Sequence, residues 1–216
     1  MLPLSWLELH PSTEMSMTFG AHHFGKILLI VVAALGLSGC FVTSEHPVEG
    51  TGPDADPALA GAWRGLDEDG KPEPGVYMHG ILNRNGEGVT LALIEKDDLM
   101  VVRGTTVKTG SNTILNGVLV PVPGLGKMDD DEKEALGYHI LLYKVSKDRL
   151  SLYLLSHEVM ADLVEGGKIK GKVQGSGASK SVRLTATPEE LGAFFAAPDA
   201  QKYFQDKPVQ LVRLRQ

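Results

Sequence analysis

The chain of 216 residues contains one cysteine, Cys40, and this side chain carries the most readable chemistry in the sequence. A thiolate can be acylated, can bind a metal or can form a disulfide. Because no second cysteine is present, an internal disulfide and a zinc site built on several thiolates are both excluded. The two residues before it, Ser38 and Gly39, are small, as is typical of a site where a peptide is cut.

An apolar run leads to this cysteine. Ile27 to Leu37 is apolar throughout and follows Lys26, which together describe a secretory signal peptide. The run is too short for a membrane span, which needs about 20 residues. We therefore expect residues 1–39 to be a signal peptide cleaved between Gly39 and Cys40. Its leader is over-long, and a start at Met15 or Met17 would give a more ordinary one.

Leu37-Ser38-Gly39-Cys40 resembles the lipobox of bacterial lipoproteins. The resemblance implies that Cys40 is acylated, with palmitate or a similar chain, and holds the protein on the lipid bilayer; two acyl chains give durable anchoring. In the sorting rule of enteric bacteria, Phe41 after the cysteine implies the outer membrane, facing the periplasm. The alternative is a buried core helix over Ile27 to Leu37 with Cys40 as a free core thiol.

The charge of the mature chain limits its partners. Removing residues 1–39 leaves 20 basic and 25 acidic residues, a net charge of about −5. A mildly acidic domain does not hold nucleic acid by neutralising phosphates, nor anionic lipid by a polybasic patch. Residues 42–57 are rich in proline, glycine and acidic residues, so we expect residues 40–57 to form a lipidated, extended tether. Residues 58–216 then form a single β-rich globular domain.

Short aliphatic and β-branched segments recur about every ten residues between turn signals, which predicts an antiparallel meander. Asn116-Gly117 lies inside one of these segments and also fits a two-residue hairpin turn, so two registers stay open. The segments near Tyr138 and Leu155 are apolar on both faces, so they are either covered on both sides or contact a partner. We expect strands over Val76–Asn83, Val89–Glu95, Leu99–Lys108, Thr113–Val120, Tyr138–Val145 and Arg149–Leu155, and a final edge strand over Val209–Leu214.

Two capping patterns predict helices. Ser156 can cap a helix over His157–Glu165. Thr187-Pro188-Glu189-Glu190 is a capping box with proline at the first helical position, opening a helix through Ala197. Gly171 to Lys180, between them, is expected to be a glycine- and serine-rich loop. The expected fold is α+β, mostly an antiparallel β meander, as a sheet or partly open barrel, with two short C-terminal helices.

Gly61-Ala62-Trp63 resembles the Gly-x-Trp that opens the first strand of lipocalin-like barrels. The resemblance implies that the tryptophan closes the bottom of a barrel, and several bacterial members of that family are lipoproteins. The alternative is a tryptophan packed at the start of a strand in an unrelated sheet. The two C-terminal helices depart from the lipocalin plan of eight strands and one helix.

Searches for a catalytic or metal site find incomplete patterns. His157-Glu158 begins like His-Glu-x-x-His, but Ala161 occupies the place of the second histidine. His79 and His139 lie in expected strands and could meet across a sheet around a metal, although exposed or satisfied histidines are the simpler reading. The acids of Asp129 to Glu132 are consecutive, whereas a calcium loop alternates its ligands.

The glycine-rich stretch near Gly175 lacks the spacings of a nucleophile elbow and of a phosphate-binding loop, because Ser179 and Lys180 stand where glycines belong. We therefore expect no enzyme, no catalytic residue, no metal and no cofactor.

Two functions remain. The first is a non-catalytic envelope lipoprotein whose domain binds another envelope protein or polymer, through apolar faces around Tyr138 to Leu155. The second is a lipocalin-like carrier of a small apolar ligand such as a fatty acid, with the loop from Pro121 to Gly137 at the mouth of its pocket. A pocket of roughly several hundred Å³ would favour the carrier, and a filled core with an apolar surface patch would favour the interaction domain.

The lipobox makes a direct prediction of mass. The protein purified from the membrane fraction of its host should have the mass of Cys40 to Gln216 plus acyl chains, measured on the intact protein. The Cys40→Ala variant should carry no lipid. An unmodified full-length mass in the cytosol would contradict the anchor.

Overall fold

The computed structural model describes residues 42–84, 86–96, 98–122, 137–175 and 180–214. The predicted signal peptide, its cleavage site at Gly39 and the lipid attachment site at Cys40 lie outside the described residues. The same holds for Asp129 to Glu132 and for Ser176 to Ser179, so the calcium and nucleophile patterns are not placed.

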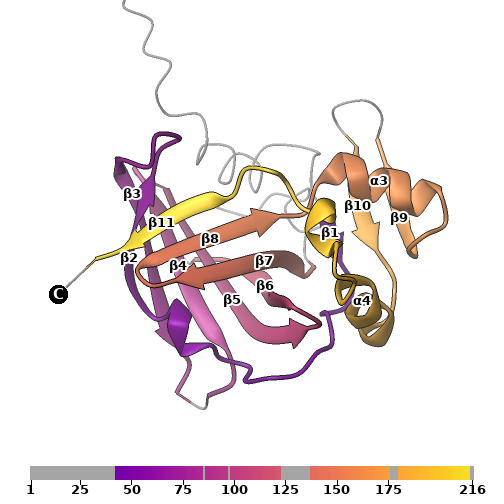
Figure 1. Cartoon of the computed structure of the whole chain (residues 1–216), viewed down its shortest axis with the longest axis horizontal. Helices are drawn as coiled ribbons and strands as arrows, with labels where there is room; N and C mark the ends of the chain where they lie inside the picture. The colour runs from indigo at the N-terminus through magenta and orange to yellow at the C-terminus, as the bar shows by residue number, and fades with distance from the viewer. Residues whose placement is uncertain (1–41, 85, 97, 123–136, 176–179, 215–216) are drawn as a thin grey trace, which may run out of the picture.

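Eight antiparallel strands form a closed barrel (Figure 1). Seven of them follow one another in the chain as a meander, and the eighth, β11, pairs with β8 on one edge and with β2 on the other. The expected α+β class with a β-rich meander is confirmed. The sheet is closed, so the last strand, expected at an edge, is paired on both sides. The strands are β2 (Gly61–Leu66), β3 (Pro72–Leu82), β4 (Val89–Glu95), β5 (Asp98–Thr109), β6 (Asn112–Val120), β7 (His139–Ser146), β8 (Arg149–Leu154) and β11 (Val209–Arg213).

Alternation along the strands separates the barrel interior from its outer surface. On β4, for example, Val89 and Leu91 are buried, while Ile94 is exposed. The inward side chains of all eight strands form one core, which we call the barrel core. Its buried members are Leu59, Trp63, Val76, Met78, Val89, Leu91, Val102, Leu115, Tyr143, Leu150, Leu152, Val209 and Leu211.

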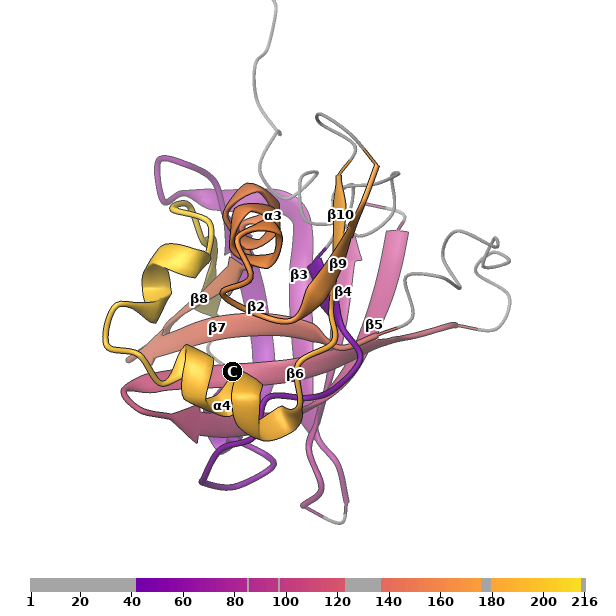
Figure 2. The ribbon, with the colours of Figure 1, turned by 90° about the vertical axis from the view of Figure 1, so that its right-hand side faces the viewer.

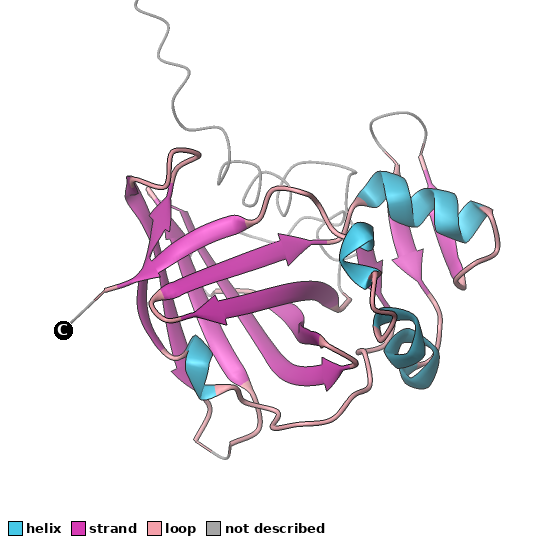
Figure 3. Cartoon of the chain, in the orientation of Figure 1, coloured by secondary structure: helices cyan, strands magenta, loops and turns pink. Residues whose placement is uncertain are grey.

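A second layer covers one side of the barrel. It comprises the helices α3 (His157–Glu165) and α4 (Pro188–Phe195) and a three-stranded sheet of β1 (Val42–Ser44), β10 (Ser181–Leu184) and β9 (Gly171–Gln174). Figure 2 shows these elements in front of the barrel, and Figure 3 shows that both α-helices lie on this side. Both predicted helices are confirmed, and each begins at its expected cap, Ser156 or Thr187.

The apolar side chains on the outer faces of β7 and β8 lie under this layer, buried at Ile140 and Leu142 and partly buried at Tyr153. Ile140 and Leu142 belong to a second core together with Leu191 and Phe195 of α4 and Met160 of α3. The apolar side chains on both faces of these two strands are therefore covered within the domain, which was one of the two expectations from the sequence. The apolar surface that we expected around Tyr138 to Leu155 is not exposed.

Residues 45–60 form a strap along the outside of the barrel. Figure 1 shows it leaving β1 and running along the lower edge of the view to the far end of the barrel. The backbone of Thr51 exchanges two hydrogen bonds with Lys108 of β5, with N to O distances of 2.9 and 2.7 Å. The Asn116 side chain of β6, which is 1% exposed, accepts from the Val48 amide at 2.9 Å and donates to its carbonyl at 3.0 Å.

These contacts correct two expectations. Residues 42–57 are not a free tether, because β1 pairs with β10 and the strap is hydrogen-bonded to two barrel strands. Asn116-Gly117 forms no hairpin turn: β6 continues through it, and the side chain of Asn116 holds the strap instead. The hairpin turns at Gly110, whose φ is +58°.

The loop expected over Gly171 to Lys180 is also corrected. Its first four residues form β9, which pairs with β10 of the second layer. These strands contain too few apolar residues to be recognised alone, and their backbone groups are satisfied only by pairing with each other and with β1.

The strap predicts a measurable loss of stability. Asn116→Ala leaves the buried amide and carbonyl of Val48 without partners, so the free energy of unfolding should fall by about 2 to 3 kcal/mol. Urea denaturation measures this difference. The control Ser111→Ala, at an exposed turn position, should change it by less than about 0.5 kcal/mol. Equal effects of the two substitutions would contradict the role of Asn116.

Candidate ligand-binding site

The two ends of the barrel differ in how they are filled. At one end, which we call the tryptophan end, Trp63 is completely buried and its indole N–H donates to the Leu59 carbonyl at 3.1 Å. The guanidinium of Arg213 lies 4.0 Å from the centre of the Trp63 ring. Arg213 also donates to the carbonyls of Ala60 and Ala58, the latter at 2.7 Å. These contacts join β11, the last strand of the barrel, to β2, its first strand, and to the short 3-10 helix η1 (Pro57–Leu59).

Gly61 makes room for this arrangement. Its φ of +107° lies in the left-handed region, and a Cβ there would lie 2.9 Å from the Arg213 guanidinium. A side chain at this position would therefore be strained and would displace the arginine. The Gly-x-Trp pattern thus has a local physical reason: the tryptophan fills this end of the barrel, and the glycine admits the arginine that covers it.

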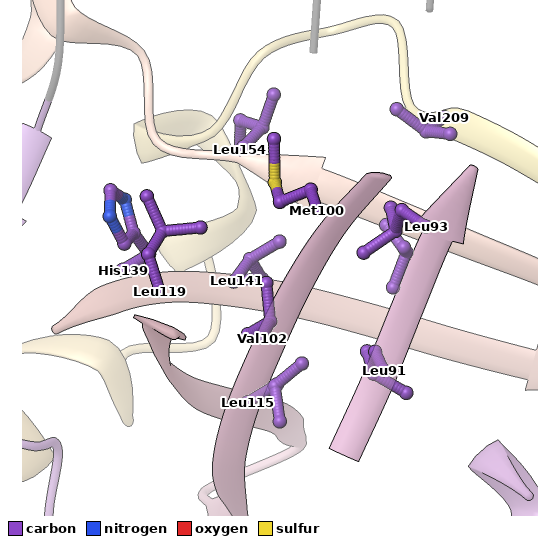
Figure 4. A pocket seen from close by; sticks show the side chains of 11 residues that line it. Leu91, Leu93, Met100, Val102, Leu115, Leu119, His139, Leu141, Leu154 and Val209 are labelled. Carbon is purple, nitrogen blue, oxygen red and sulfur yellow. The ribbon is translucent and has the colours of Figure 1, made fainter. Parts of the chain in front are cut away.

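The other end, which we call the cup end, contains an apolar cavity, the cup (Figure 4). Its volume is about 40 Å³. Five of its lining side chains, Leu93, Met100, Leu119, Leu141 and Leu154, are only partly buried in the described part of the chain. The full lining is Leu91, Leu93, Met100, Val102, Leu115, Leu119, His139, Leu141, Leu152, Leu154 and Val209.

The cup end is where the loop of residues 121–137 begins and ends. Leu119 and His139, which both line the cup, lie two residues from the described ends of that loop, Pro121 and Gly137. Most of the loop, residues 123–136, lies outside the described residues. Its expected position at the mouth of a pocket therefore stays a prediction.

His139 is the one titratable side chain in the cup lining. It is 7% exposed, and burial lowers the pKa of its imidazole to about 4. The ring is therefore neutral at pH 7, so the cup presents no charge of its own.

Glu95 is the next inward residue after Leu93 on β4, on the side of the cup end. It pairs in register with Val76 of the barrel core and with Asp98 of β5. The residue is 6% exposed, and its buried Oε2 has no hydrogen-bond partner among the described residues. Burial raises the pKa of the Glu95 carboxyl; the nearby Lys96 opposes this shift, and Glu73 and Asp98 add to it.

An exposed apolar stripe crosses the outside of β3, β4 and β5. Tyr77, Ile94 and Leu99 lie side by side in register on the three strands and are each at least 36% exposed. Ile81, further along β3, is 50% exposed. This stripe lies away from the second layer, which contacts β5 at its other end, where the Thr109 hydroxyl donates to the Gly192 carbonyl of α4. The stripe replaces the surface expected around Tyr138 to Leu155.

The two histidines proposed to share a metal do not meet. His79 points outward from β3 and is exposed, whereas His139 points inward from β7, and the two strands are not neighbours in the barrel. His157 and Glu158 lie in the first turn of α3, with Ala161 buried one turn later. No group of three metal-binding side chains occurs within the described ranges.

Sequence reasoning missed Glu95 and Arg213. A single acidic residue at the end of a strand looks like an ordinary turn residue, and only the register shows that it faces inward. Arg213 could have been found as the one charged residue at an inward position of the last strand.

No helix in the described part of the chain is long and apolar enough to cross a membrane. Comparison of the chain with protein-family models, with curated proteins and with solved structures gives no match in any of the three.

The buried histidine predicts a pH dependence of stability. The unfolded chain binds a proton at His139 near pH 6.5 and the folded chain only near pH 4, so the folded state loses stability as pH falls through this window. Between pH 7 and 5 the loss from this residue should be about 2 kcal/mol. The test compares urea denaturation of the wild-type chain and of His139→Gln at both pH values. A stability difference between them that does not change with pH would contradict the neutral buried imidazole.

Proposed function

We propose that this protein is a non-catalytic binding protein of the bacterial envelope whose barrel takes a small apolar ligand in the cup. The observation that carries the proposal is the cup itself: an apolar cavity at one end of a barrel whose other end is filled. Apolar side chains that are left partly in contact with water are costly, at about 25 cal/mol per Å². A ligand that covers them recovers this free energy, so the cup favours an apolar occupant.

The size of the cup restricts the ligand. Cavities for drug-sized molecules measure about 300 to 1,000 Å³, whereas this one measures about 40 Å³. A rigid ring system therefore does not fit. A slender alkyl chain is the better candidate, because Met100 and the other partly buried side chains can turn aside for it, methionine being the most adaptable of them.

The fold is compatible with the lipocalin-like carrier suggested by Gly61-Ala62-Trp63. In support, Trp63 fills one end of an eight-stranded antiparallel barrel, as the resemblance implied. The attachment of the protein to the bilayer through acylated Cys40 is part of the proposal and rests on the lipobox-like residues 37–40. The outer membrane and the periplasm, as its location, rest on Phe41.

A second candidate function is binding of an envelope protein or polymer. The observation in its favour is the exposed stripe of Tyr77, Ile94 and Leu99, together with a barrel that is largely filled. Contiguous apolar surface of this kind is typical of interaction sites. The two candidates use opposite faces of the same strands, and single substitutions can therefore separate them.

Neighbouring residues of β5 provide the test. Met100 points into the cup and Leu99 points outward into the stripe. Met100→Trp should fill the cup and weaken binding of octanol, a neutral probe with a slender alkyl chain, by about tenfold or more, since an inserted side chain removes the space for the ligand. Isothermal titration calorimetry on the purified chain measures the affinity.

Leu99→Trp is the matched control, because it adds the same indole one residue away on the outer face. Its probe affinity should stay within about twofold of the wild type, as expected of a surface substitution. Equal probe binding by all three proteins would contradict a ligand site in the cup. Loss of binding only in Leu99→Trp would favour the outer stripe instead.

A further inference from the structure

The barrel contains an unexplained acid directly beyond the cup. Glu95 follows Leu93 on the inward side of β4, and Leu93 lines the cup. The two Cα atoms are two residues apart on a strand, about 6.6 Å. Glu95 is thus one step along the strand from the apolar cavity, on the side of the partly buried lining residues.

The position of the Glu95 carboxyl lowers the stability of the folded chain. Its Oε2 is buried and has no hydrogen-bond partner in the described residues, although buried polar atoms in proteins are almost always paired. The residue as a whole is 6% exposed, and Oε2 is the buried oxygen of its carboxyl. None of the ion pairs in the described part of the chain includes it. A buried carboxyl oxygen without a protein donor is explained if a ligand supplies the missing hydrogen bond.

The charges around Glu95 select the kind of donor. Glu73 of β3 and Asp98 of β5 both act on its carboxyl as like charges, and Lys96 is the one basic neighbour that acts on it. A ligand with a carboxylate head would meet repulsion from these acids. A head with N–H or O–H donors would be attracted, most strongly when it carries a positive charge.

We propose that the cup binds an amphiphile with a slender alkyl tail and an amine or hydroxyl head, and that Glu95 accepts a hydrogen bond from this head. The inference rests on the proposed function of the cup and names the ligand class. It replaces the fatty acid that sequence reasoning suggested, because a carboxylate is the head group that this end of the barrel rejects. The strand from Glu95 to Leu91 provides about 13 Å for the tail.

Three probes with one tail and different heads test the proposal: octylamine, octanol and octanoate. The binding of each is measured by isothermal titration calorimetry to the chain carrying Cys40→Ala, so that no acyl chain is attached. Near pH 7.5 the amine is a cation and the acid an anion. Octylamine should bind at least about tenfold more tightly than octanoate, as expected for a charge-assisted hydrogen bond in place of repulsion. Octanol should lie between them.

Glu95→Gln isolates the carboxyl. It should bring the ratio of amine to carboxylate affinity to within about threefold of one and leave octanol within about twofold of its wild-type affinity. Glu87→Gln makes the same change of charge at an exposed residue on the turn between β3 and β4, away from the cup, and should leave the ratio as in the wild type.

The outcomes are separable. If octanoate binds as tightly as octylamine, or if Glu95→Gln keeps the wild-type ratio, the head-group assignment is overturned while the cup remains a ligand site. If none of the three compounds binds, the proposed function fails and the head-group assignment fails with it. The wild-type ratio alone tests the assignment even if Glu95→Gln does not fold.

Discussion

The whole barrel depends on the pairing of β11 with both β8 and β2. Without it, two strands would present unpaired backbone edges, which invite aggregation. Between β8 and β11 the chain passes once through the second layer, by way of α3, β9, β10 and α4. Arg213, near its C-terminal end, adds contacts to the Trp63 ring and to two carbonyls at the start of the barrel. Closure therefore joins the two ends of the domain.

Closure of the barrel also gives each strand an inner face and an outer face with different surroundings. Inward side chains fill the tryptophan end and line the cup, whereas outward ones contact the second layer, the strap or water. The strap is held by Asn116, whose amide offers one acceptor and one donor to a single residue, as a neighbouring strand would. The Asn116 side chain thus pairs with the Val48 backbone in the way that the backbone of a neighbouring strand would.

Much of the fold could be predicted from local sequence. The strand over Val89–Glu95 and the helix over His157–Glu165 have the bounds expected, because alternation and a serine cap act within a few residues. The strands β1 and β9 could not be predicted, because they exist only through their pairing with β10. The strap looked like a tether for the same reason: its composition is that of an extended chain, and its partners are 50 or more residues away in sequence. Glu95 was missed because an acid beside a turn has an ordinary local explanation, and only the register turns it inward.

The strap also limits how far the domain can stand from its anchor. A free chain over residues 41–57 would have a root-mean-square reach of about 23 Å. In the folded domain the chain is held from Val42 onward, and Ser44 is bridged to Tyr138, the residue before His139 of the cup. Two residues span at most about 7 Å. In the proposed lipoprotein, the link between the anchor and the domain is therefore short, and the domain lies close to the lipid surface with the start of β7 nearest to it. A ligand leaving the bilayer would have little water to cross before it reached the barrel.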